Sequence, residues 1–336
     1  MATVVNKVQE LEEIIGFSKH EQVVQGVINA IDDKIVTQGS MLPSVNNMVK
    51  ELGFASKTIV KAYKELKERG IVESKNRLGY FVVNEATDQT MKVALLLYAF
   101  HPFQEIFYNA FREGVGANIQ VDVFFHHHNI EVFENILKNI VGKYGMYVVA
   151  PIPHPYTKTI LDKIPRNKLL LVDRYEELEG EFSHVTQEFE IATYMALKEL
   201  EESIRKFDRL ILFFRFDSPI EILQSFDKFL KDTKIEGEVQ SQYIPGTIQR
   251  GTAYYALGDA DLWNILKDAK EWNLEVGKDI GCVASNNDPV KEIICGGITT
   301  FSTDFEMMGL KAAEFIKHKK TIQESIPSNL IRRVSL

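Results

Sequence analysis

Residues 54–66, FASKTIVKAYKEL, combine two chemically different faces in one short segment. Its apolar residues recur at the three- and four-residue spacing of the inward face of an amphipathic helix, at Ile59, Ala62, Tyr63 and Leu66. The opposite face carries a serine and three lysines, Ser56, Lys57, Lys61 and Lys64. A charged outer face on a helix is most often only solvated, so the flanking sequence must show whether this one binds anything.

The preceding sequence predicts two more helices. HEQVVQGVINAI, residues 20–31, is amphipathic, and LPSVNNMVKELG, residues 42–53, has Ser44 as a predicted N-cap and Gly53 as a predicted C-cap. The helix of residues 54–70 should then begin at Ser56 as N-cap and end at Gly70. Because only residues 53–55 separate the last two helices, the arrangement is that of a tight helix-turn-helix.

A basic hairpin follows the third helix. The runs IVES and YFVV flank the turn KNRLG, in which Gly79 supplies conformational freedom. Residues 50–80 contain eight lysines and arginines and four glutamates, which leaves a local charge of +4 in a chain whose net charge is −8. A local patch of this kind can bind phosphates although the whole chain is acidic.

Composition limits the class of protein. A length of 336 residues suggests two or three domains. Cys282 and Cys295 are too few for a disulfide framework and too far apart for a metal knuckle, which favours a reducing compartment. The N-terminal segment does not resemble a signal peptide, and no run of about 18 apolar residues is present. We therefore expect a cytoplasmic protein.

A polar segment, NEATDQT at residues 84–90, separates this helical part from a long alternation of strands and helices. We expect a DNA-binding domain at 1–84, a linker at 85–91 and an effector domain at 92–336. Continuous apolar runs of strand length alternate with helical patterns and predict a doubly wound α/β domain with a parallel sheet. The runs are residues 93–100, 121–125, 146–152, 168–174 and 209–215.

Residues 18–83 resemble the winged-helix DNA-binding domain of the GntR family, through LPSVNNMVKELG, SKTIVKAYKELKERGIVES and RLGYFV. They depart from it at Asn46, Ser56 and Val60, where the family often has arginine. The resemblance implies that the third helix enters the major groove and that the wing reaches the minor groove. The residues implied for DNA contact are Ser44, Asn46, Asn47, Ser56, Lys57, Thr58, Lys61, Lys64, Lys75, Arg77 and Gly79.

Residues 91–336 resemble the effector domain of LacI-type repressors, which has the two-lobed periplasmic-binding-protein-like fold. The most specific segments are GDADLWNILKDAKEWNLEVGKDIGCVASNN, GGITTFSTDFEMMGLKAAEFI and NLIRRVS. One departure is the short stretch between Gly246 and Asp259, where the family usually has a crossover helix and a strand. We expect only the strand there. Together the two resemblances imply a sugar-responsive repressor.

Ligands of such sheets bind in loops beyond the carboxyl ends of strands. Arginine, aspartate and asparagine can hydrogen-bond neighbouring sugar hydroxyls, and an aromatic face can cover the ring. No obvious Lys/Arg pair stands in these loops, which favours a neutral monosaccharide; a deoxyhexose such as fucose is one candidate. The expected ligand-binding residues are His101, Phe103, Gln104, Asp173, Arg174, Gln187, Arg215, Phe216, Asp217, Asp259 and Asn286.

Three adjacent histidines, residues 126–128, together with His154 suggest a metal site at first sight. Neighbouring residues of a strand point to opposite faces, so three in a row would not converge on one ion. The aspartates of GDADLW could be taken for a magnesium pair, but they fit a strand end and a helix start. We expect no metal and no cofactor.

The sequence thus predicts a homodimeric regulator that binds a pseudo-palindromic operator and a sugar effector. The sugar would enter between the lobes of the effector domain and alter the relative position of the two DNA-binding heads. An alternative is an enzyme with a doubly wound domain fused to a DNA-binding head, of which a pyridoxal-phosphate aminotransferase fusion is one form. A third possibility, a solute-binding protein for transport, is opposed by the DNA-binding head.

Overall fold

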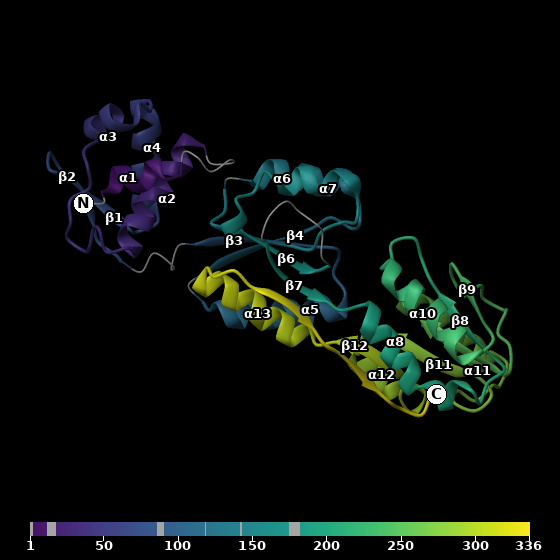
Figure 1. The fold of residues 1–336 in the computed structure, drawn as a ribbon. Helices are drawn as coiled ribbons and strands as arrows, with labels where there is room; N and C mark the ends of the chain where they lie inside the picture. The colour runs from purple at the N-terminus through teal and green to yellow at the C-terminus, as the bar shows by residue number, and fades with distance from the viewer. Residues whose placement is uncertain (1–2, 12–17, 86–90, 118, 142, 175–181) are drawn as a thin grey trace. The chain divides into compact units, whose positions relative to one another are not determined.

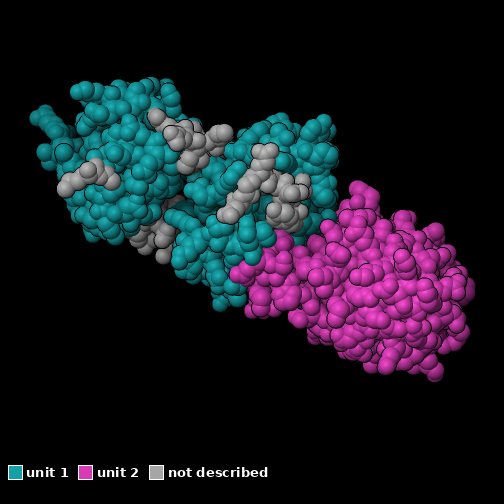
Figure 2. Space-filling model, viewed as in Figure 1, with its two compact units in different colours: residues 1–99, 111–184, 310–323 teal, residues 100–110, 185–309, 324–336 magenta. Residues whose placement is uncertain are grey.

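The computed structural model describes residues 3–11, 18–85, 91–117, 119–141, 143–174 and 182–336. The chain divides into two compact units (Figure 2). Unit 1 comprises residues 1–99, 111–184 and 310–323, and unit 2 comprises residues 100–110, 185–309 and 324–336. The chain therefore passes between the units repeatedly. The predicted linker, residues 85–91, lies mostly outside the described residues, so its bounds stay a prediction.

The N-terminal part of unit 1, which we call the head, consists of four helices and a hairpin (Figure 1). Its elements are α1 (Val4–Gln9), α2 (Lys19–Asp32), α3 (Val45–Leu52), α4 (Ser56–Glu68), β1 (Val72–Lys75) and β2 (Gly79–Val82). The predicted inner face of α4 is buried, and Tyr63 donates a hydrogen bond of 2.7 Å to the carbonyl oxygen of Pro43. Val4 and Val8 of α1, a helix that the sequence did not predict, belong to the same core.

The helix ends of the head agree with the sequence in α3 and differ in α4. Ser44 caps α3 by accepting a hydrogen bond from the backbone N–H of Asn47, and Gly53 ends it with a left-handed φ of 67°. The prediction that Ser56 caps α4 is wrong, because the N-cap is Ala55. The chain turns into the helix one residue earlier than expected, directly after Phe54, whose side chain is buried in the core.

The second part of unit 1, lobe 1, is built on a parallel sheet. Its central strands confirm four predicted runs, with the order β6-β5-β3-β4: β3 (Lys92–Leu97), β4 (Gln120–Phe125), β5 (Met146–Val149) and β6 (Leu169–Asp173). Helices α6 (Ile130–Ile140) and α7 (Pro155–Leu161) cover one face and share its core. On the other face lie α5 (Pro102–Val115) and α13 (Phe305–His318) (Figure 1). Two further strands, β7 (Ser183–Gln187) and β13 (Gln323–Ile326), extend the sheet beyond β6.

Unit 2 contains a second six-stranded sheet, in the order β14-β12-β11-β10-β8-β9. The strands are β8 (Arg209–Phe213), β9 (Gly237–Gln240), β10 (Thr252–Ala256), β11 (Gly281–Ser285), β12 (Thr299–Thr303) and β14 (Ser328–Ile331). One face packs against α8 (Glu190–Glu199), α9 (Glu201–Ile204) and α10 (Ile220–Thr233), and the other against α11 (Asp259–Glu271). The described residues 241–251 contain no helix, which confirms the shortened crossover before β10. A short helix, α12 (Pro289–Ile293), follows β11.

Among the described residues, no helix combines the length and the apolar character that crossing a membrane requires.

Candidate functional site

The N-terminal end of α4 presents polar groups to solvent. Ser56 and Lys57 are exposed, whereas Thr58 is half-buried. The N-cap, Ala55, has no side chain that could accept a hydrogen bond from the first turn. The first backbone N–H groups of α4 therefore have no side-chain cap, and together with Lys57 they suit a phosphate oxygen.

The remaining basic residues of the head differ in their surroundings. Lys64 is exposed and lies 3.5 Å from Glu68, a weak surface pair that leaves it able to contact a DNA backbone. Lys61 shares the side of α4 that carries Glu65 and Arg69 and lines a pocket there. Asn46 and Asn47 are exposed in the first turn of α3, while the hydroxyl group of Ser44 is already used as a cap.

The wing places its basic residues around a tight turn. Arg77 is exposed at the tip with a left-handed φ of 61°, and Gly79 follows with a φ of 118°. Lys75 lies over the ring of Phe81, with its Nζ 4.9 Å from the ring centroid, and pairs with Glu73 at 3.1 Å. Arg77 is thus presented by a backbone conformation that few side chains adopt, whereas Lys75 is held against the hairpin.

In lobe 1, several predicted and unpredicted residues meet where the strands end. Arg174 follows β6 and lies over the ring of Tyr98, 5.2 Å from its centroid. His128, after β4, stacks on the same ring at 4.5 Å. Tyr98 itself donates a hydrogen bond of 2.6 Å to the carbonyl oxygen of Pro151. Asp173, directly before Arg174, has a left-handed φ of 70°, a strained conformation of the kind that clusters at functional sites.

His126 is fully buried beside this cluster. Its Nε2 lies 3.0 Å from the carbonyl oxygen of Ala150, and its Nδ1 has no hydrogen-bond partner among the described residues. The pKa of His126 is lowered to about 4, mainly by burial and also by the charges of His128, His127 and Arg174, against the opposing effect of the hydrogen bond to Ala150. The imidazole is therefore neutral at pH 7, and Nδ1 is left as a buried acceptor.

The sequence suggested only a metal role for this histidine triplet and placed it on a strand. The triplet instead follows β4, and His127 and His128 both have left-handed φ values, of 49° and 57°. The three histidines therefore do not lie on a strand, and the expectation that they point to alternating faces of one was wrong. The described residues hold no group of metal-binding side chains. The histidines directly follow a predicted strand, and this position could have marked them as ligand-binding candidates.

In unit 2, Asp259 and Asn286 are joined by a lysine that the sequence did not single out. The side chain of Lys291 is completely buried, and its Nζ lies 2.7 Å from Oδ1 of Asp259 and 3.2 Å from Oδ2 of Asp288. The same ammonium group donates to the carbonyl oxygens of Ser285 and Asn286, at 3.0 and 2.8 Å. Lys291 thus fixes both predicted residues at the ends of β10 and β11.

Aromatic residues form a second group in unit 2. Phe103 packs against Phe305 with ring centroids 4.8 Å apart, and His101 stacks on Phe103 at 5.6 Å. Phe103 and Gln104 were expected in a loop, but α5 already begins at Pro102, so both lie in its first turn. Gln104 is buried. The group nevertheless places two stacked aromatic rings at the start of α5.

The other predicted residues of unit 2 make local contacts. The side-chain oxygen of Gln187 accepts a hydrogen bond of 2.6 Å from Thr303. Arg215 pairs with Asp217 at 3.5 Å in the loop after β8, and Phe216 between them is 95% exposed.

Comparisons with known proteins agree with both parts of the chain. Residues 19–82 match the family model "Bacterial regulatory proteins, gntR family". An HTH-type transcriptional regulator of Mycobacterium tuberculosis, Rv1152, is 33% identical over 75 residues, which are 22% of this chain and 62% of that protein. The chain therefore matches less than two thirds of the length of this relative.

The rest of the chain is similar to solved structures. The trehalose repressor of Escherichia coli aligns with a TM-score of 0.61 at 13% identity, over 72% of this chain and 99% of that one. A LacI family regulator of Lactobacillus casei with bound sucrose gives 0.61 at 15%, over 73% and 99%. A periplasmic binding protein/LacI regulator of Alkaliphilus metalliredigens in complex with D-xylulofuranose gives 0.59 at 10%, over 73% and 98%. The chain thus joins a GntR-type winged helix-turn-helix domain to a domain with the fold of LacI-type effector domains.

Proposed function

We propose that the protein is a DNA-binding transcription regulator, acting as a repressor, whose affinity for its operator is controlled by a neutral monosaccharide. The observation that carries the proposal is the union, in one chain, of a winged helix-turn-helix head and a domain whose polar and aromatic side chains gather at the carboxyl ends of parallel strands. Such ends are where α/β sheets of this kind bind small molecules.

The head supports the DNA-binding part of this proposal. The uncapped N-terminus of α4, Lys57 and the wing residue Arg77 are all exposed. The relative from Mycobacterium tuberculosis, which aligns with this chain over 75 residues, is described as a transcriptional regulator. These comparisons favour a regulator over the alternative of an enzyme fused to a DNA-binding head.

The effector domain supports a sugar as ligand. Arg174 and Asp259 supply charged hydrogen-bonding groups, and the exposed ring of His101, stacked on Phe103, supplies an aromatic face. Solved structures of the same fold contain sucrose and D-xylulofuranose. The charged residues predicted in unit 2 are balanced by opposite charges, Arg215 by Asp217 and Asp259 by Lys291. Such balanced pairs suit an uncharged ligand with many hydroxyl groups.

The ligand can change DNA affinity only through a difference in its affinity for the DNA-binding and the DNA-releasing conformations. We propose that such a difference is transmitted through a homodimer, in which two heads bind two half-sites. Unit 2 carries an apolar surface that suits contact with a second copy. It surrounds a cavity of about 890 Å³, and the adjacent Ile293 is 78% exposed. The apolar part of the cavity lining includes Trp263, Leu266, Leu274, Val290, Ile294 and Val334, and the charged part consists of Lys267, Lys270, Glu275 and Lys278.

A thermal-shift screen of the full chain against neutral sugars and their phosphates tests the ligand assignment, because a ligand that binds only the folded state raises its stability. The expected result is one sugar that raises the melting temperature and changes affinity for an operator selected from random DNA. Failure to select any DNA sequence would refute the regulator. Visible absorbance of the purified protein at pyridoxal-phosphate wavelengths would instead support the enzyme.

Ile293→Glu tests the dimer. Placing a charge in an apolar interface is costly, so sedimentation should show a monomer while circular dichroism stays unchanged. Val239→Glu is a matched control, because Val239 is also an exposed β-branched residue of unit 2 but lies on the edge strand β9. A dimer that persists in Ile293→Glu would exclude this surface as the interface.

A further inference from the structure

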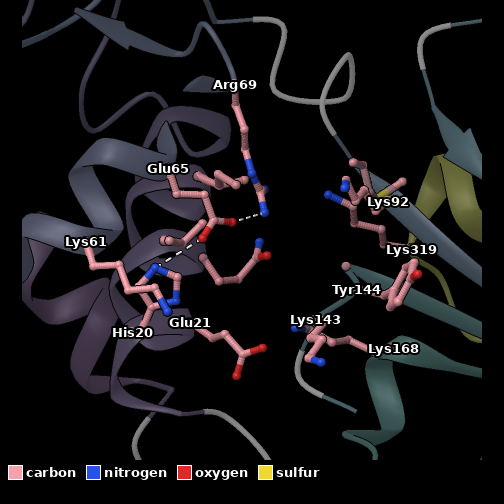
Figure 3. Close-up of a pocket in the computed structure, with 15 residues that line it drawn as sticks. His20, Glu21, Lys61, Glu65, Arg69, Lys92, Lys143, Tyr144, Lys168 and Lys319 are labelled. Carbon is pink, nitrogen blue, oxygen red and sulfur yellow. Dashed lines mark hydrogen bonds and ion pairs between the residues drawn. The ribbon is translucent and has the colours of Figure 1, made fainter. Parts of the chain in front are cut away.

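Unit 1 contains a pocket beside the N-terminal ends of lobe 1 strands (Figure 3). Arg174 and His128, in contrast, follow the carboxyl ends of β6 and β4. Its volume is about 340 Å³, within the range of small-molecule sites. Four lysines come from lobe 1. Lys92 begins β3, Lys143 precedes β5, Lys168 precedes β6 and Lys319 follows α13. The head contributes Lys61 and Arg69 from α4 and its C-cap.

The pocket carries far more positive than negative charge. Six lysine and arginine side chains line it, against the two carboxylates of Glu21 and Glu65. Counted with every lysine and arginine charged and His20 neutral, the lining has a formal charge of +4 in a chain whose formal net charge is −8. A concentration of one sign of charge around a small concave surface attracts ligands of the opposite sign.

Both carboxylates of the pocket are already bound to neighbours in the head. Glu65 pairs with Arg69, and it also contacts Nε2 of His20 at 3.1 Å (Figure 3). Glu21 closes the capping box of α2, where its Oε2 accepts hydrogen bonds from the backbone N–H and the hydroxyl of Ser18, at 2.9 and 2.8 Å. The charge of Glu65 is thus balanced by Arg69, whereas Glu21, whose hydrogen-bond donors in Ser18 are uncharged, still acts on Lys168.

The pKa of Lys168 is lowered to about 7, mainly because the ammonium group is buried. The charges of Lys319 and Arg69 contribute to this shift, and Glu21 opposes it. Of the other lobe 1 lysines, Lys319 has an acidic neighbour outside the pocket lining, Asp32, at 3.6 Å. The pocket thus disfavours a charge on Lys168, and an anion placed among these side chains would reverse that preference.

We propose that this pocket binds a small, multiply charged oxyanion, such as the phosphate or pyrophosphate group of a metabolite. Lysine ammonium groups act as point charges and can converge on phosphate oxygens from several directions. A neutral sugar offers no charge for them to balance. The site is therefore distinct from the sugar-binding residues proposed above, which follow the carboxyl ends of the strands, and it adds a second effector that is charged.

The test uses the full chain, with pyrophosphate, citrate and chloride as probes at matched ionic strength. Calorimetric titration should show one pyrophosphate bound per chain and a raised melting temperature, with chloride inactive. Citrate distinguishes a general preference for multiple negative charge from a preference for phosphate. Lys143→Gln, at an exposed position, should weaken pyrophosphate binding by about tenfold, since a charge-assisted contact is lost. Lys231→Gln, at an exposed lysine of α10, should bind as wild type does.

Lys168 provides a second readout. Because the anion requires the protonated ammonium group, binding should be tighter at about pH 6 than at about pH 8. The charged and titratable groups around it include Glu21, Lys319, Arg69 and His20, so a Lys168→Met variant serves to assign the pH effect. In that variant the pH dependence should shrink. If it persists unchanged, the titrating group is another one and Lys168 does not contact the anion.

Two results would overturn the proposal. One is equal melting-temperature shifts with pyrophosphate and chloride. The other is a loss of operator affinity in Lys143→Gln when no small anion is present, because the lysines would then be contacts of the DNA backbone. Neither outcome depends on finding the sugar, so the sugar proposal can fail while this one stands.

Discussion

Nζ of Lys291 lies 2.7 Å from Oδ1 of Asp259, and the two groups differ sharply in their access to water. The lysine side chain is completely buried, whereas that of Asp259 is 41% exposed. The carboxylate is therefore fixed from inside the protein and still open to a ligand from outside. A buried ammonium group with several oxygen partners is stable only while those partners remain.

Lys291→Met should lower the free energy of unfolding of unit 2 by about 3 kcal/mol, because it leaves Asp288 and the Asp259 carboxylate without their common cation. Urea denaturation followed by tryptophan fluorescence measures this, since both tryptophans, Trp263 and Trp272, lie in α11 or at its end. Lys198→Met is the control: it removes a surface pair with Glu201 and should cost at most about 1 kcal/mol. Equal costs in the two variants would refute the structural role of Lys291.

Arg174→Ala should abolish the melting-temperature shift caused by the sugar and leave DNA affinity without sugar unchanged. Arg166→Ala is a matched control, because Arg166 also lies over an aromatic ring, that of Phe182, but before β6 rather than after it. Its sugar response should equal that of wild type. A full sugar response in Arg174→Ala would leave Arg174 with a structural role only.

Lys57→Ala should weaken operator binding by about 1–3 kcal/mol if the ammonium group contacts a base edge. Lys64→Ala should weaken binding to operator and random DNA alike and lower the salt dependence by about one counterion. Fluorescence anisotropy over a series of salt concentrations separates the two effects. A Lys57/Lys61→Ala double variant that keeps wild-type affinity and a native circular dichroism spectrum would contradict the role of α4.

His126 should make unit 1 less stable as the pH falls. Its pKa is about 4 in the folded protein and 6.5 as an unperturbed group, so the unfolded chain binds the proton first. Stability from this residue is complete above pH 6.5 and declines between pH 6.5 and 4. Between about pH 7 and about pH 5, the stability advantage of wild type over His126→Phe should shrink by about 2 kcal/mol. His318→Gln, at an exposed histidine, is the control, and a constant difference for His126→Phe would show that His126 does not titrate this way.

A fragment of residues 1–90 should fold, because the head has its own core built from α1–α4 and the hairpin. It should bind a half-site weakly, since one head makes few phosphate contacts, whereas two linked heads gain from a high effective concentration. The sugar should alter operator binding of the full chain only. A fragment as tight as the full chain would exclude control through a dimer.

Periodicity predicted α4 and the central strands well, because burial of one helix face or of whole strands leaves a regular apolar pattern. It predicted their ends less well. The apolar run covers residues 146–152, but β5 ends at Val149. Pro151 follows two residues later and has no N–H to donate to a neighbouring strand. Helix α1 and strand β7 escaped prediction because one is six residues long and the other, SHVTQ, is mostly polar.

The candidate sites show the same limit. Strand ends mark where ligand-binding residues can lie, so Arg174, Asp259 and Asn286 were accessible to sequence reasoning. Lys291 was not, because its contact with Asp259 joins two segments far apart in the chain and appears locally as one more charged residue in a short helix. Gln104 was expected in a loop, but α5 begins at Pro102, so Gln104 lies in the first turn of a helix.

The division of the chain between the two units also sets an order for synthesis. The head is complete once residues 3–85 have left the ribosome, and domains that form early fold early. Unit 1 is finished only by residues 310–323, and unit 2 only by residues 324–336. Nascent or prematurely terminated chains would therefore carry a folded head without a working sensor. If the proposed function holds, we expect such chains to bind operator half-sites weakly and without response to the effector, so their removal would keep them from competing with the full chain.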